Sequence, residues 1–117
     1  MKRKIRFRSF MDGTLTTMIQ EICDFEIKDK KICIKMKEYN FEIDTTSTKV
    51  NYLTPRPNSF EFDKKKVIKT TYHTEYGDID FDVITKKHDL SNSHLVIEYE
   101  LSQGGVVQAK YRILLDY

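Results

Sequence analysis

Hydroxyl-bearing side chains alternate with other residues along the C-terminal half of the chain, and they are the residues best placed for chemistry. Because successive side chains of a β-strand point to opposite faces, residues at alternate positions share one face. Here that face is otherwise apolar, so the hydroxyls are expected to point into the interior of the protein. The expected interior set is Thr70, Tyr72, Thr74, Phe81, Thr85, Tyr99 and Tyr111.

A buried hydroxyl needs a hydrogen-bond partner, and two kinds of partner lead to different functions. If the hydroxyls bond to each other, to the backbone or to ordered water, the interior is filled and their role is structural. If they line an open space, they predict a binding site for a small apolar or amphipathic molecule. Neither alternative requires a cofactor, a metal ion or a catalytic residue.

The histidines do not form a recognisable catalytic or metal-binding pattern. His73 is expected on an outer face opposite Asp80, where a surface ion pair accounts for it. His88 and His94 flank a predicted turn that carries Asp89, and a spacing of six residues with one carboxylate is no zinc signature. Phosphate-binding loops, dinucleotide fingerprints and local Ser-His-Asp patterns are absent from the sequence. We therefore expect a protein without enzymatic activity.

An acidic series at positions 78, 80 and 82 shares one outer face. The expected register sets Asp80 opposite Glu100 and Asp82 opposite Glu98, and such like-charge pairs cost stability. Lys110, expected beside Glu98, would relieve the repulsion. A divalent cation or a basic partner is the alternative.

A basic stripe follows the outer face of the first strand and is formed by Lys2, Lys4, Arg6 and Arg8. If the first strand lies beside the last, Lys110 and Arg112 extend the stripe. Such a patch could contact phosphates. The sequence shows no exposed aromatic side chains on which bases could stack, however, so protection of a sheet edge by solvated lysines is the simpler interpretation. An interaction module that uses its outer charges on a protein or RNA partner remains the second functional hypothesis.

The elements that position these residues are predicted to be strands almost throughout. Alternation of period two is clearest in 79–83, 95–101 and 107–115, and it recurs in 5–7, 15–27 and 32–36. With no helix to cover an apolar sheet face, about eight strands are expected to form a closed antiparallel meander barrel, an all-β fold. The weaker alternation in 39–62 leaves open whether that region forms paired strands or a lid. Pro55 and Pro57 indicate a loop or a sheet edge there.

Strand register can be predicted because a slip of one residue would turn the apolar face to water. For the last hairpin this favours a three-residue loop over Gln103–Gly105, with Gly105 in the left-handed conformation. Around Tyr76-Gly77 it places Tyr72 opposite Phe81, and across the next connection it places Phe81 opposite Tyr99.

The two cysteines are predicted to stay unpaired. A tight turn at Asp29-Lys30 pairs Phe25 with Ile34, which turns Cys23 inward and Cys33 outward. Side chains on opposite faces of a sheet cannot reach disulfide geometry.

Length and charge are typical of one globular domain spanning 1–117. Twenty Lys and Arg against eighteen Asp and Glu give a formal net charge of +2, too small a field to attract a polyanion by itself. No apolar run approaches the roughly 20 residues of a membrane span. We therefore expect a cytoplasmic protein that does not interact with membranes, and the sequence does not indicate its oligomeric state.

The C-terminal half resembles a known family. The segment 72–77, the strand ending at 83–85, the strand 95–101 and the closing strand 111–115 are similar to the YwiB-like proteins of low-GC Gram-positive bacteria. That resemblance covers roughly residues 60–117 and implies a calycin-type β-barrel related in shape to lipocalins. Proteins of this family are uncharacterised, so the resemblance implies a fold and no set of site residues.

Overall fold

The structure is a computed structural model that describes residues 1–53 and 56–117, and ten strands account for most of them. They are β1 (Lys2–Met11), β2 (Thr14–Lys28), β3 (Lys31–Lys35), β4 (Tyr39–Ile43), β5 (Ser47–Tyr52), β6 (Asn58–Asp63), β7 (Ile68–Thr74), β8 (Gly77–Leu90), β9 (His94–Gln103) and β10 (Val106–Asp116). The described part of the chain contains no helix long and apolar enough to cross a membrane.

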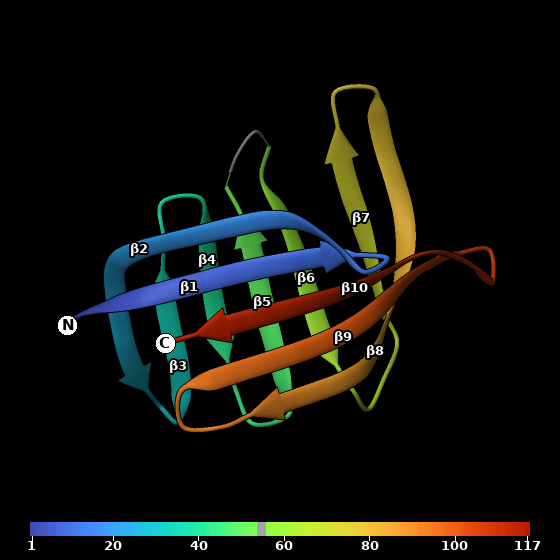
Figure 1. Ribbon diagram of the computed structural model, residues 1–117. Coiled ribbons are helices and arrows are strands. Elements are labelled where there is room, and N and C mark those ends of the chain that lie inside the picture. The colour runs from blue at the N-terminus through green and yellow to red at the C-terminus, as the bar shows by residue number, and fades with distance from the viewer. Residues whose placement is uncertain (54–55) are drawn as a thin grey trace.

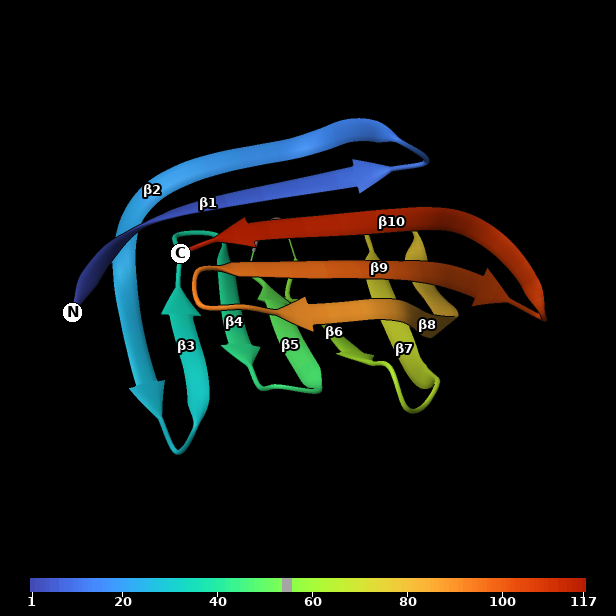
Figure 2. The ribbon, with the colours of Figure 1, turned by 60° about the horizontal axis from the view of Figure 1, so that its bottom comes forward.

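All ten strands belong to one antiparallel sheet in the order β6-β5-β4-β3-β2-β1-β10-β9-β8-β7. The sheet folds over on itself, so that β1, β10 and β9 cross in front of β3 to β7 (Figure 1). The long strand β2 bends from one layer into the other, which a second view shows from below (Figure 2). The sheet thus forms a nearly closed barrel whose two end strands, β6 and β7, meet at a seam.

The core lies between the two layers and draws on nearly every strand. Its largest fully buried side chains include Phe7 of β1, Phe25 of β2, Phe41 of β4 and Phe62 of β6. Burial of these apolar surfaces at roughly 25 cal/mol per Å² is the main force that closes the barrel.

The predicted all-β antiparallel barrel is confirmed, and the predicted count of about eight strands is wrong. The region 39–62 forms three short paired strands, β4, β5 and β6, where the alternation is weakest. Their inner faces carry polar residues, Thr48 and Asn58, beside apolar ones, and this mixture masks the period of two. Of the two prolines, Pro57 precedes β6 and belongs to no strand, and Pro55 lies outside the described residues.

The loop predicted for the last hairpin is wrong, because a β-bulge corrects the register. Val106 pairs with Gln103, so the turn contains only Gly104 and Gly105, with φ of 59° and 82°. The register then shifts between Val107 and Ala109, which restores the apolar match one residue later. The prediction that Gly105 adopts the left-handed conformation is confirmed.

The predicted partners of Phe81 are also wrong. The turn after β7 lies at Glu75 and Tyr76, one residue earlier than expected, and Thr74 pairs with Gly77, so that Phe81 faces Thr70 instead of Tyr72. The β8–β9 connection is shorter than expected, with Leu90 paired to Leu95, and together with a register shift between Thr85 and Lys87 this places Tyr99 opposite Thr85. Bulges of this kind add one unpaired residue and bend a strand, which a barrel of long strands needs and a regular alternation rule does not anticipate.

The predicted register of the Asp29-Lys30 hairpin is confirmed, with Phe25 paired to Ile34 and Ile27 to Ile32. Both turn residues have positive φ, 52° and 64°. Cys23 is buried, Cys33 is only partly so, and both are free thiols. Burial raises the pKa of the Cys23 thiol, which keeps it protonated and unreactive.

Candidate functional site: an aromatic cavity at the barrel mouth

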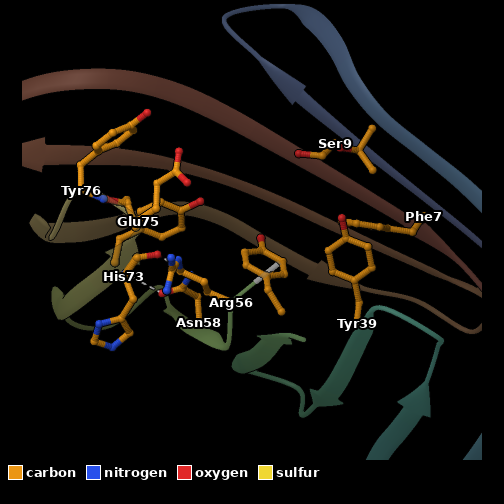
Figure 3. A pocket seen from close by; sticks show the side chains of 12 residues that line it. Phe7, Ser9, Tyr39, Arg56, Asn58, His73, Glu75 and Tyr76 are labelled. Atoms are coloured by element: carbon orange, nitrogen blue, oxygen red, sulfur yellow. Dashed lines mark hydrogen bonds between the residues drawn. The ribbon is translucent and has the colours of Figure 1, made fainter. Parts of the chain in front are cut away.

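A cavity of about 820 Å³ opens at the end of the barrel where β5 ends, β6 begins and the β7–β8 turn projects. Its lining comes from both layers. Phe7 and Ser9 of β1 face it from one side, and the turn residues Glu75 and Tyr76 face it from the other (Figure 3). Its volume falls in the range of small-molecule sites, roughly 300–1,000 Å³.

One wall of the cavity is a continuous row of aromatic rings. Phe7 contacts Tyr39 edge to face at a centroid distance of 4.9 Å, and Tyr39 contacts Tyr52 at 5.2 Å with the ring planes at 89°. The row continues to Phe60 at 5.4 Å and from there to Tyr72 at 6.0 Å. Because β6 carries Phe60 and β7 carries Tyr72, the row also spans the seam of the barrel. Of the five rings, Phe7, Tyr39, Tyr52 and Tyr72 line the cavity, and Phe60 is buried next to it.

The tyrosine hydroxyls of this wall are hydrogen-bond donors at neutral pH. Burial raises the pKa of Tyr39 and Tyr52, and it raises the pKa of Tyr99, beneath them, still further. A phenol whose pKa is raised stays protonated. The wall therefore combines apolar ring surface with O–H groups and carries no negative charge.

Polar residues at the rim come from the β5–β6 and β7–β8 connections. The Asn58 side chain bridges to β7: its Oδ1 accepts a hydrogen bond of 2.7 Å from the His73 amide, and its Nδ2 donates one of 3.2 Å to the His73 carbonyl. Arg56 and Glu75 are exposed, and among the described residues neither forms an ion pair. The His73 ring turns away from the cavity, toward Asp78 at 2.8 Å (Figure 3).

The structure divides the seven residues predicted for the barrel interior among several places. Tyr72 and Thr74 line the cavity. Thr85 and Tyr99 are buried in the core below it. The remaining three line smaller hollows elsewhere, Thr70 and Phe81 on the β7–β8 hairpin and Tyr111 beside the β1–β2 turn.

Most of the cavity lining comes from residues that the sequence did not single out. Tyr39, Tyr52 and Asn58 belong to the region left open between strands and a lid, and Arg56 follows directly on the undescribed pair 54–55. Phe7 belongs to the alternating segment 5–7, for which no role in a site was predicted. The sequence does contain one signal for this lining, because the short strands β4, β5 and β6 carry aromatic residues at inner positions. These residues are Tyr39, Phe41, Tyr52 and Phe60.

His88 lies inside the barrel, at the end opposite the cavity, and the expectation that it flanks a turn is wrong. The bulge after Thr85 exchanges the inner and outer faces of β8, so that His88 pairs with Ile97 and is only 8% exposed. Its Nε2 lies 2.7 Å from Thr48 Oγ1, and its Nδ1 is buried without a partner among the described residues. Burial lowers the pKa of His88, so the ring is neutral at physiological pH.

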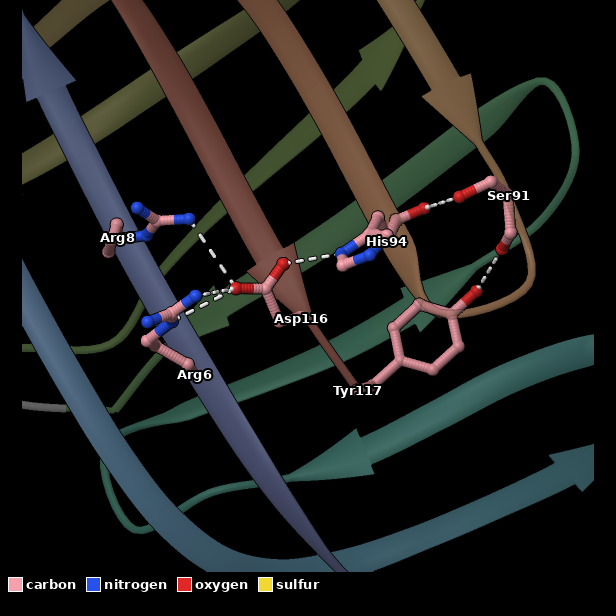
Figure 4. A network of polar contacts seen from close by, with 6 residues as sticks. All are labelled: Arg6, Arg8, Ser91, His94, Asp116 and Tyr117. Atoms are coloured by element: carbon pink, nitrogen blue, oxygen red, sulfur yellow. Dashed lines mark hydrogen bonds and ion pairs between the residues drawn. The ribbon is translucent and has the colours of Figure 1, made fainter.

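The outer basic stripe is largely neutralised within the molecule. β1 lies beside β10, as predicted, and Asp116 accepts hydrogen bonds of 2.9 and 2.8 Å from Arg6 and one of 3.4 Å from Arg8 (Figure 4). His94 reaches the other oxygen of the same carboxylate at 2.6 Å. Lys2 pairs with Asp24 at 2.6 Å. The stripe therefore offers less free positive charge than its sequence suggests.

The predicted repulsion among the outer acidic residues is wrong as well. Asp82 faces Ser102, and Glu98 lies between Lys87 and Arg112, with Arg112 Nη2 at 3.3 Å. His73 pairs with Asp78 and not with Asp80. The repulsion that motivated a bound cation is thus missing. No group of three metal-ligating side chains occurs in 1–53 or 56–117.

Comparisons with known proteins support the fold and define the family. A family model described as a domain of unknown function, DUF1934, matches residues 55–115. The crystal structure of the YwiB protein from Bacillus subtilis is similar over 97% of this chain and 89% of that chain, with a TM-score of 0.65 and 12% sequence identity. A search of curated proteins gave no match.

Proposed function

Since the chain belongs to the DUF1934 family, whose function is unknown, we propose from its geometry that it binds a small amphipathic molecule at the mouth of its barrel. The observation that carries the proposal is the cavity of about 820 Å³ with a wall of aromatic rings and a polar rim. An apolar wall with a few polar groups is the usual composition of a ligand site. Its position at the open end of a barrel corresponds to a calycin-like or lipocalin-like mode of binding.

The proposed role is that of a non-enzymatic binding protein of the cytoplasm. The described residues of the lining include no arrangement of nucleophile and base, because the ring of His73, the one histidine among them, points outward to Asp78. Two free thiols fit a reducing compartment. The alternative, an interaction module with protein or RNA, has less support because Asp116 and Asp24 already occupy three of the four basic side chains of the outer stripe.

A direct test is native mass spectrometry of the protein purified from its own host, which should reveal a retained small molecule. A second test uses the neutral dye N-phenyl-1-naphthylamine, whose fluorescence rises in apolar surroundings. Thr17 lines the cavity from β2, and the side chain of a Thr17→Trp variant would occupy part of it. We expect the substitution to weaken dye binding at least tenfold, whereas Gln20→Trp, on the exposed outer face of the same strand, leaves binding unchanged. Equal binding by both variants would refute the site.

A further inference from the structure

The charges around the cavity indicate which end of an amphipathic ligand the rim receives. Arg56 is the only permanently cationic side chain among the described residues of the lining, and it forms no ion pair there. Figure 3 shows it near Asn58 among the residues that line the cavity. A guanidinium group presents five N–H donors in a planar fork that matches a carboxylate, sulfonate or phosphate group.

Other side chains around the cavity can also donate hydrogen bonds. Asn58 uses one N–H of its amide on the His73 carbonyl, which leaves its second N–H free. The Tyr39 and Tyr52 phenols stay protonated, since burial raises the pKa of both. Thr74, by contrast, is satisfied, because its hydroxyl donates to the Gly77 carbonyl and accepts from the Tyr76 amide. The excess of donors favours a ligand rich in acceptor oxygens.

Glu75 is the one acidic side chain among the described lining residues, and it stands on the β7–β8 turn, where it is exposed to solvent. The aromatic row, in contrast, runs from Phe7 to Tyr72, with Asn58 and Arg56 adjoining its far end on β6 and the connection before it. Arg56 and Glu75 thus reach the cavity from two different connections, the segment before β6 and the β7–β8 turn.

We infer that the ligand is an aromatic molecule that carries one anionic group, with its ring on the Tyr39–Tyr52 wall and its anion on Arg56. This inference rests on the proposed function, because it requires the cavity to be a binding site. Edge-to-face contacts with the existing rings favour an aromatic body over an aliphatic chain.

The matched dye pair that tests the inference differs by a single anionic group. 8-Anilinonaphthalene-1-sulfonate is N-phenyl-1-naphthylamine with an added sulfonate, so the ratio of their dissociation constants isolates the contribution of the charge. We expect the sulfonate to bind about tenfold more tightly at low salt, as one charge-assisted contact would give. Arg56→Gln should abolish that difference and leave the neutral dye unaffected. Lys64→Gln, which removes a lysine at the other end of the barrel, is the control and should change neither constant.

The outcomes separate this inference from the proposed function. If both dyes bind with equal affinity and Thr17→Trp weakens both, the cavity is a binding site and the anionic preference is refuted. If neither dye responds to Thr17→Trp, the proposed function itself fails. Tighter binding of the sulfonate after Glu75→Gln would support the inference, and a preference for a cationic dye that Glu75→Gln removes would overturn it. Displacement by 1-naphthoate but not by decanoate supports an aromatic body, and the reverse would replace it with an aliphatic one.

Discussion

His88 is held inside the barrel as a neutral imidazole with only one of its two nitrogens satisfied. Thr48, itself fully buried, is the partner of Nε2 at 2.7 Å, and Nδ1 has none among the described residues. A neutral ring tolerates this arrangement at a modest cost, but a protonated one would place an unpaired charge in the core. The barrel is therefore expected to respond to pH through this residue.

The stability of the protein should fall as the pH drops below about 6.5, the ordinary pKa of histidine. Burial lowers the pKa of His88 in the folded state, so in this range the unfolded chain binds a proton that the folded protein does not. The stability that His88 contributes is present above the unfolded pKa and is lost as the pH falls through the folded pKa. For one proton the slope cannot exceed about 1.4 kcal/mol per pH unit. Urea unfolding of the wild type and of His88→Gln between pH 7.5 and 5 measures this slope of stability against pH.

The matched control for this experiment is His73→Gln, which removes an exposed histidine paired with Asp78. His88→Gln should flatten the wild-type slope more than this variant does. An undiminished slope in His88→Gln would assign the pH response to other groups.

At the scale of strands, Asn58 completes a sheet that backbone pairing alone leaves open. β6 and β7 end the sheet on its two sides, and the Asn58 amide bonds to both the N–H and the C=O of His73. An asparagine side chain thereby takes the place of a partner strand's peptide group. This contact lies at the rim of the cavity, so closure of the barrel and shape of the site depend on the same residue.

Asn58→Ala should lower the free energy of unfolding by about 1 to 2 kcal/mol, because it leaves the His73 amide and carbonyl without partners. Hydrogen exchange of the His73 amide should accelerate, whereas amides in the central β1–β10 ladder should not change. Asn58→Asp keeps the acceptor and loses the donor, so its His73 amide should remain protected. Ser59→Ala, on the outer face of β6, is the control. Equal exchange rates in wild type and Asn58→Ala would show that the side chain does not hold the seam.

Strand identity could be predicted from the sequence more reliably than strand pairing. The Asp29-Lys30 hairpin was predicted correctly because its strands are regular on both sides of the turn. The hairpins around Gly77 and Gly104 were not, since the β7–β8 turn lies one residue earlier than expected and bulges at 85–87 and 107–109 shift the partners. Of the cavity, Tyr72 and Thr74 were anticipated. The other lining residues come together through contacts between strands that are distant in the sequence, and a local sequence pattern does not predict such contacts.

For the molecule as a whole, Asp116 stabilises the contact between the two halves of the sheet. The chain forms β1–β6 on one side and β7–β10 on the other, and the β1–β10 ladder joins them. The Asp116 carboxylate, on β10, contacts Arg6 and Arg8 of β1 and His94 of β9 (Figure 4). Burial alone would raise its pKa, but the hydrogen bonds from Arg6 and His94 outweigh that effect and lower it.

Asp116→Asn should reduce stability by about 1 to 2 kcal/mol at pH 7, because it removes the charge that Arg6 and Arg8 share. A lowered folded pKa means that the carboxylate stabilises the protein above the unfolded value of 3.8, and that this contribution is lost as the pH falls through the folded pKa. The wild type and the variant should therefore converge in acid. Thermal unfolding at pH 7 and at pH 3 measures both ends of the range.

The control for this substitution is Asp24→Asn, which breaks the fully exposed pair with Lys2 and should have a much smaller effect. A difference between wild type and Asp116→Asn that persists undiminished at pH 3 would contradict a role for the carboxylate charge.

The pairing of β1 with β10 also dictates an order of events on the ribosome. β10 is the last of the ten strands to be translated, and Arg6 of β1 bonds to Asp116, which lies 110 residues later in the chain. Until Asp116 has emerged, the nascent chain presents β1 with one unpaired edge, and such an edge can pair with another chain. The lysines and arginines spaced along that edge then act as a temporary safeguard against aggregation, because like charges on neighbouring nascent chains repel each other until the final strand covers the gap.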